Sequence, residues 1–207
     1  MKRLVVLALL TLPIAGCDLF STRTPEPPTS GNTFIWTPAT TVSYLLDNFT
    51  GTLQALDASN YARVFIASSD STGSGSKAFT FTPSPNLDQG SRNVFLVWIP
   101  ESERQWLSKL QSLLVKGSQL TVILSNPVID QTASSSASFS ADYTISIPVA
   151  SSTTALPSVV QGSLQMQLVN VTTEQGSKEW RISSWSDFQP KTGSAPTWTD
   201  LKVKLSS

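Results

Sequence analysis

Histidine is absent from this chain of 207 residues, and cysteine occurs once, at Cys17. Histidine is the commonest general acid or base in enzymes and the commonest metal ligand. The composition therefore excludes zinc sites, Ser-His-Asp triads and Cys-His dyads, and no glycine-rich phosphate-binding motif is present. Any catalysis would have to use Asp, Glu, Tyr or Lys, and we expect neither a metal nor a cofactor.

Charged residues are also scarce, at 14% of the chain, with 14 basic and 14 acidic side chains. The sequence contains no basic run, and two of the basic residues, Lys2 and Arg3, stand at its very start. Recognition of a nucleic-acid backbone needs a basic patch or stripe. We therefore expect no nucleic-acid partner.

Long apolar runs are limited to one, at residues 4–12, which is too short for the roughly 20 residues that a transmembrane helix needs. The basic pair before it and the small residues after it are typical of a secretory signal peptide. The motif IAGC at residues 14–17 resembles the lipobox of bacterial lipoproteins. This resemblance implies a signal peptide at residues 1–16 and a lipidated Cys17 carrying palmitate or a similar acyl chain. An ordinary signal peptide with an incidental cysteine is the alternative.

A lipid on Cys17 would place the protein in the bacterial cell envelope, attached to a membrane and facing the periplasm or the exterior. Two or more acyl chains anchor a protein stably, whereas one chain is marginal. A thiol consumed as a thioether is also protected from the oxidation that threatens free cysteines in exported proteins. Asp18 resembles the inner-membrane retention signal of enteric-type lipoproteins, a rule that depends on the organism.

The rest of the chain divides into a tether, one domain and a tail. Residues 17–33 contain STRTPEPPTSGN, a stretch of the kind that forms extended spacers. Residues 34–190 are long enough for one domain with a full core. Residues 191–207 form a polar tail, which we expect to pack on the domain through Trp198.

Helical spacing of apolar residues dominates the first part of the domain. Thr37-Pro38 is typical of a helix start, and a helix is expected from there to Leu56. Asp57 is expected to cap a short second helix that turns Tyr61 inward. A third helix is expected from Glu101 to Gly117, with Trp106 on its buried face.

Alternating patterns of period two follow. A short strand is expected at residues 78–83, and four longer strands are expected around Val122, Tyr143, Met166 and Ile182, joined by hairpin loops. Helices followed by an antiparallel meander predict an α+β domain with the helices packed on one sheet face.

This element order resembles the NTF2-like fold (SnoaL-like, cystatin-related), a curved sheet wrapped around an N-terminal helix to form a cone. Four local motifs are similar to its lipoprotein branch: WTP at residues 36–38, LDASNY at 56–61, FTFTP at 79–83 and WRI…WSD at 180–187. The resemblance spans about residues 36–188. It implies that Asp and Tyr side chains line the cone in the enzymes of this superfamily.

Four aromatic residues are candidates for lining a pocket: Tyr61, Trp98, Tyr143 and Trp185. Trp106 and Trp180 are expected in the core instead. Four acidic residues were considered as general bases, namely Asp47, Asp57, Asp142 and Asp187, but the pattern turns none of them inward. We therefore expect no catalytic residue.

Three functions follow from these patterns. The first is an envelope lipoprotein whose non-catalytic NTF2-like module binds a small apolar ligand or an envelope protein. The alternative is an NTF2-like hydrolase, isomerase or dehydratase that uses Tyr and Asp without His or metal. A purely structural tethered domain is the third. A deep cavity with a carboxylate beside a tyrosine would favour the enzyme, and a filled cone would favour the binding module.

Overall fold

The computed structural model describes residues 34–72, 78–148 and 156–206. Cys17, the predicted signal peptide and almost all of the predicted tether lie outside these residues, so those assignments stay predictions. The described residues belong to one compact unit, Gly31–Ser207.

A five-stranded sheet forms one layer of this unit, in the order β1-β5-β4-β3-β2. Strands β2 (Thr121–Ala133), β3 (Ser136–Ser146), β4 (Val159–Thr172) and β5 (Lys178–Phe188) form the predicted antiparallel meander. Strand β1 (Thr80–Thr82) pairs with β5 in parallel, so the sheet is mixed rather than purely antiparallel. Hairpin turns fix the direction of the meander strands, whereas β1 is joined to the meander by helices that leave its direction open.

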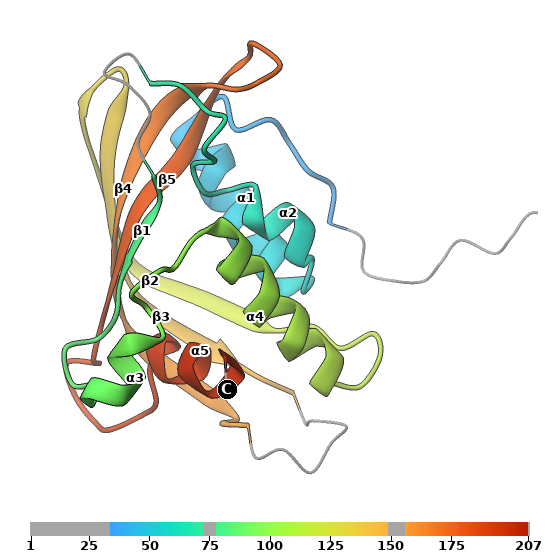
Figure 1. The fold of residues 1–207 in the computed structure, drawn as a ribbon, viewed down its shortest axis with the longest axis vertical. Coiled ribbons are helices and arrows are strands. Elements are labelled where there is room, and N and C mark those ends of the chain that lie inside the picture. Colours follow the sequence, from blue (N-terminus) through green and yellow to red (C-terminus); the bar gives the residue numbers. More distant parts are fainter. Residues whose placement is uncertain (1–33, 73–77, 149–155, 207) are drawn as a thin grey trace, which may run out of the picture. The chain divides into compact units, whose positions relative to one another are not determined.

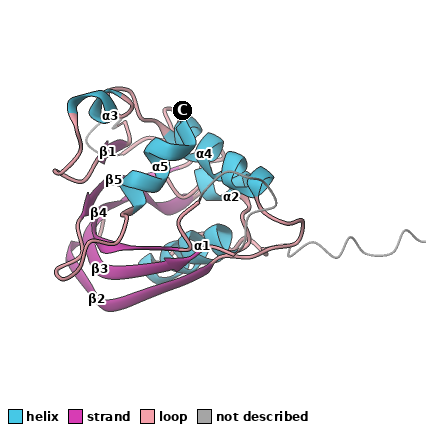
Figure 2. Ribbon diagram, turned by 90° about the horizontal axis from the view of Figure 1, so that it is seen from below, coloured by secondary structure: helices cyan, strands magenta, loops and turns pink. Residues whose placement is uncertain are grey.

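One face of the sheet is buried, and the alternation of side chains along each strand decides which of them face the core. Along β3, alternate side chains from Ala137 to Ile145 are buried, and the residues between them are Ser, Thr and Asp. The longer helices lie on the concave side of the curved sheet (Figures 1 and 2). The core lies between the two layers, as expected for an α+β domain.

Helix α1 (Val42–Gln54) begins later than predicted, after Thr41 rather than Thr37. The Oγ1 atom of Thr41 accepts a hydrogen bond from the backbone N–H of Tyr44. Asn48 donates to the carbonyl of Thr37 at 2.6 Å and accepts from its N–H at 3.3 Å, which satisfies the residue that was expected to begin the helix. Packing explains the glycine at position 51 within the helix, because a Cβ there would lie 2.1 Å from the Phe34 ring.

Helix α2 (Ala58–Ala62) follows, capped by Asp57 as predicted. Helix α3 (Gln89–Asn93) was not predicted, and its N-cap is Asp88. Helix α4 (Pro100–Leu113) has proline at its first position and ends before Gly117, which lies in the turn that leads to β2 with a φ of 85°.

The last element, α5 (Trp198–Ser206), is a helix within the predicted tail. Trp198, Thr199, Leu201, Lys202 and Leu205 are all buried. Figure 1 shows α5 beside the sheet at the end of the chain, on the same side as α4. Helix α5 thus forms part of the core between the sheet and the other helices.

Candidate functional site

Two polar centres are buried where α5 enters the interior, and the first joins β3 to β5. Tyr143 donates a hydrogen bond from Oη to Oδ1 of Asp187 at 2.8 Å. Gly162 lies opposite Tyr143 on β4, and a Cβ there would be 2.5 Å from Oη, so the absence of a side chain makes room for the phenol. The first turn of α5 completes the centre. Trp198 N–H donates to Tyr143 Oη at 2.7 Å, and Thr199 donates from both N–H (2.8 Å) and Oγ1 (2.6 Å) to Asp187 Oδ2.

Burial dominates the titration of this centre. Removal from water raises the pKa of Asp187 above its ordinary value, although three donated hydrogen bonds oppose the shift. Burial, with the nearby Asp187 carboxylate, also raises the pKa of Tyr143. Tyr143 therefore stays protonated and keeps donating to Asp187, while both Asp187 oxygens are already engaged.

The second buried centre joins α4 to α5. Glu103 and Lys202 are fully buried, and Lys202 Nζ donates to Glu103 Oε1 at 2.6 Å. Oε1 also accepts from Trp98 Nε1 at 2.7 Å. Oε2 accepts from Trp106 Nε1 at 2.6 Å and from Tyr61 Oη at 3.4 Å. The carboxylate thus receives hydrogen bonds from four side chains, and three of these lie outside α5.

Aromatic rings surround the Lys202 ammonium. Nζ lies 3.7 Å from the ring centroid of Phe81 and 3.8 Å from that of Trp185, with Trp98 and Trp106 at 5.5 and 5.8 Å. These distances are within the range of cation–π attraction. Burial lowers the pKa of Lys202 to about 8, because the attraction of Glu103 offsets only part of the lost hydration.

The four aromatic residues predicted for a pocket all lie in this interior. Tyr61 and Trp98 donate to Glu103, Tyr143 donates to Asp187, and Trp185 packs against the Lys202 ammonium. Trp98 also borders a surface pocket of about 440 Å³, and Tyr143 borders one of about 410 Å³. Tyr61 and Trp185 border none of the surface pockets described here. Their role in binding an external ligand stays a prediction.

The acidic candidates fall into two groups. Asp57 caps α2, and Asp142 lies on the outer face, where it accepts from Ser163 Oγ at 2.6 Å and Asn126 Nδ2 at 2.9 Å. The expectation that no pattern turns Asp187 inward was wrong, because its side chain is 1% exposed. A register shift between Gln167 and Leu168 changes the alternation of β5 after Ile182, which a strict period of two cannot anticipate.

Glu103 and Lys202 were not recognised from the sequence, although a helical pattern included both. Glu103 is spaced three and four residues from Trp106 and Leu107, which places it on the buried stripe of α4. Lys202 is likewise four residues after Trp198 and three before Leu205. Each charged residue lies on the apolar face of its helix. Two opposite charges on apolar faces of separate helices were the sequence signal that could have predicted a buried ion pair.

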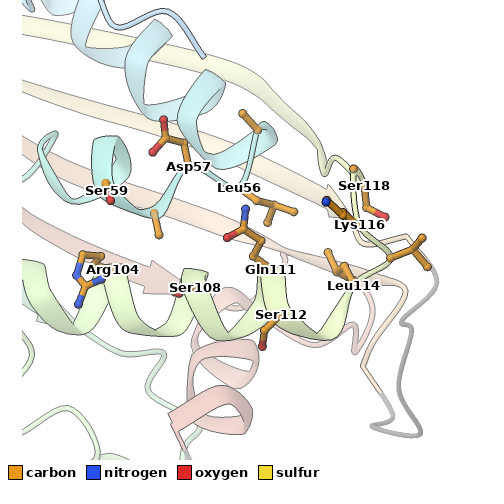
Figure 3. Close-up of a pocket in the computed structure, with 14 residues that line it drawn as sticks. Leu56, Asp57, Ser59, Arg104, Ser108, Gln111, Ser112, Leu114, Lys116 and Ser118 are labelled. Atoms are coloured by element: carbon orange, nitrogen blue, oxygen red, sulfur yellow. The ribbon is translucent and has the colours of Figure 1, made fainter. Parts of the chain in front are cut away.

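Outside the interior, a groove of about 670 Å³ runs between the start of α2, helix α4 from Arg104 onward and the loop that follows α4 (Figure 3). Its lining mixes polar and apolar surface and carries charges of both signs, including Asp57, Arg104 and Lys116. None of the four predicted aromatic residues lines this groove. Its composition offers hydrogen bonds but no aromatic surface for a ligand.

Within residues 34–72, 78–148 and 156–206, no cluster of three or more potential metal ligands is present. In the same segments, no helix combines the length and apolar character needed to cross a membrane.

No protein-family model and no curated protein sequence matches the chain. A solved structure from Novosphingobium aromaticivorans, provisionally assigned as an aromatic ring hydroxylase, superposes with a TM-score of 0.50 at 14% identity, covering 77% of this chain and 93% of the other. The chain has an NTF2-like fold. A protein of the same organism, provisionally assigned as a scytalone dehydratase, gives 0.48 at 12% identity, with 76% and 90% covered. An NTF2-like superfamily protein from Salmonella enterica gives 0.46 at 11% identity, with 74% and 91% covered.

These comparisons concern the fold of the NTF2-like domain and leave its activity open, because all three identities are low. The predicted fold class is confirmed: helices pack on a curved, mostly antiparallel sheet. The predictions of a lipid anchor, of a binding function and of an absent activity are not tested by them.

Proposed function

We propose that the protein is a bacterial envelope lipoprotein, anchored through Cys17, whose NTF2-like domain is a non-catalytic module for binding a small ligand or an envelope protein. One observation carries the non-catalytic part. Tyr143 and Asp187, an Asp–Tyr pair of the kind that the resemblance implies for the cone of the enzymes, are bonded to the first turn of α5 through Trp198 and Thr199.

A general base must lie within hydrogen-bond reach of the proton that it removes. Asp187 Oδ1 accepts from Tyr143, and Oδ2 accepts twice from Thr199, so a substrate beside Asp187 would have to displace α5. The Trp198 ring fills the adjoining space, with its centroid 4.5 Å from that of Trp185 and 5.3 Å from that of Tyr143. This arrangement uses the carboxylate and the phenol to hold a helix.

The enzyme alternative has one observation in its favour, which is the same pair. A buried carboxylate with a raised pKa beside a tyrosine is the kind of group that acts as a general base. The alternative therefore requires that α5 leave the interior readily, whereas the binding module requires that it stay.

Amide hydrogen exchange in the full-length chain separates the two functions. We expect the N–H groups of Trp198 and Thr199 to exchange as slowly as those of the central strand β4, because opening them removes a buried helix. Ser206, at the exposed end of α5, serves as the internal control for fraying. Exchange of Trp198 and Thr199 as fast as that of Ser206 would favour the enzyme and contradict the proposal.

The anchor is tested separately by mass spectrometry of the N-terminal peptide from native membranes. We expect a peptide that begins at Cys17 and carries the mass of its acyl chains. A Cys17→Ser variant should lose the lipid and leave the membrane fraction. An unacylated peptide with another starting residue would contradict the anchor and leave the proposal about the domain intact.

A further inference from the structure

The carboxylate and rings around the Lys202 ammonium form a cage that the rest of the domain builds. The ammonium cage consists of Phe81 from β1, Trp98, Glu103 and Trp106 from the start of α4 and the turn before it, and Trp185 from β5. Lys202 is the single contribution of α5 to this centre. The five walls therefore belong to other elements, although Trp198 of α5 also packs against Trp106 and Trp185.

The Glu103 carboxylate has three hydrogen-bond donors besides the Lys202 ammonium, and none of them belongs to α5. Trp98 and Trp106 donate to its two oxygens at 2.7 and 2.6 Å, and Tyr61 donates at 3.4 Å. These three donors would compensate part of the buried charge if Lys202 withdrew. Preorganised charge and preorganised rings reduce the ordering cost that a ligand would have to meet.

A buried lysine often stabilises a packed helix no better than an apolar side chain of similar volume. Removing both charges of an ion pair from water costs several kcal/mol per ion, and apolar residues of similar volume often give equal or greater stability. Leu201 and Leu205 already bury the neighbouring positions of α5. The ion pair therefore adds specificity for an ammonium group at a position where a methionine would suffice for packing.

The ammonium cage adjoins a pocket at the surface of the domain beside α5. The pocket of about 440 Å³ is lined by Trp98 and Trp106 together with Leu205, so it lies where two walls of the ammonium cage meet α5 at the surface.

We propose that the ammonium cage is a binding site for a primary alkylammonium ion and that Lys202 is a tethered occupant with which such an ion competes. The ligand class follows from the contacts. The rings attract any cation, but the 2.6 Å contact with Glu103 needs an N–H donor, which a quaternary ammonium lacks. This inference rests on the proposed binding function and names the ligand class for it.

Excision of the lysine side chain tests the proposal with a small probe. A Lys202→Ala variant removes three methylenes and the ammonium, which together have the size and charge of n-propylammonium. Calorimetric titration of the full-length variant in detergent should show one site per chain. We expect n-propylammonium to bind at least tenfold more tightly than n-propanol or n-propyltrimethylammonium, since a hydrogen bond to a charged group contributes about 1.5–3 kcal/mol.

Competition by Lys202 and the position of the binding site are tested by comparing four chains. The native chain should bind n-propylammonium at least tenfold more weakly than the Lys202→Ala variant, because the tethered lysine competes. A Lys204→Ala variant, changed at an exposed position of the same helix, should behave like the native chain. Adding Glu103→Gln to Lys202→Ala should weaken binding at least tenfold. Equal affinity of the native and Lys202→Ala chains, or no preference for n-propylammonium over n-propanol, would overturn the proposal.

If the Lys202→Ala variant does not fold alone, its refolding yield in the presence of each probe tests the proposal instead. Recovery with n-propylammonium but not with n-propanol supports the ammonium cage, whereas equal recovery with both, or with neither, overturns it. Slow exchange at Trp198 and an acylated Cys17 would still support the proposed function after such a failure, so the two proposals are distinguishable.

Discussion

Replacing Trp198 by alanine is the most direct test of the idea that α5 is part of the core. The side chain is fully buried, and its ring contacts Phe49, Trp106, Tyr143 and Trp185 at centroid distances of 4.5 to 6.4 Å. Truncation of a buried tryptophan to alanine costs about 3–5 kcal/mol. The backbone hydrogen bond to Tyr143 Oη survives the change, because the N–H is retained.

One feature of Trp198 lowers the expected cost. Its Nε1 is buried without a hydrogen-bond partner among the described residues, and such a group costs about 1–3 kcal/mol. We therefore expect Trp198→Ala to reduce the free energy of unfolding by about 3 kcal/mol, at the lower end of the range. For a chain of this size, that corresponds to a fall in Tm of about 6–12 °C.

Urea unfolding followed by circular dichroism measures this change, and Trp36→Ala is a matched control. Trp36 is half-buried and packs under the Arg63 guanidinium at 4.1 Å, outside the α5 contacts. An exposed cation–π contact contributes about 0.5–1 kcal/mol, so the control should lose much less stability. A loss for Trp198→Ala below about 1 kcal/mol, or equal to that of the control, would refute the view that α5 is held by its tryptophan.

Three further outcomes are expected. Gly162→Ala should destabilise the domain by about 1–3 kcal/mol in urea unfolding, because the new Cβ would lie 2.5 Å from Tyr143 Oη; an unchanged midpoint would contradict this contact. Asp57→Ala should cost about 0.5–2 kcal/mol through loss of the α2 cap, with Asp57→Asn, which can still cap, as the milder control. Above pH 8, the unfolded chain binds a proton that native Lys202 has released, so stability should rise with pH toward 10 relative to a Lys202→Met variant; parallel pH profiles would refute the lowered pKa.

Local patterns were sufficient for most elements of this domain. Alternation of period two located β2 to β5, and the Asp57 cap and the helical spacing around Trp106 located α2 and α4. Each of these depends on contacts within a few residues, which a sequence displays directly. The start of α1 was misplaced because Asn48, eleven residues away, satisfies the backbone of Thr37.

The candidate site shows the opposite balance. Tyr61 and Tyr143 were expected to face inward from their own segments, but their partners Glu103 and Asp187 lie 42 and 44 residues away. Asp187 also follows an irregularity in the ladder that reverses the expected alternation. No short-range rule could pair these groups, because the pairing depends on which strand lies beside which.

The sequence by itself thus determined the α+β class and the order of the elements other than α3 and α5, since these depend on periodicity and caps; the envelope address inferred from one short N-terminal motif stays a prediction. The tertiary structure alone decided that the polar tail becomes α5 and enters the core. A lysine 99 residues from its glutamate is stable there only because the carboxylate and the surrounding rings replace its lost hydration. That compensation exists in three dimensions and not along the chain.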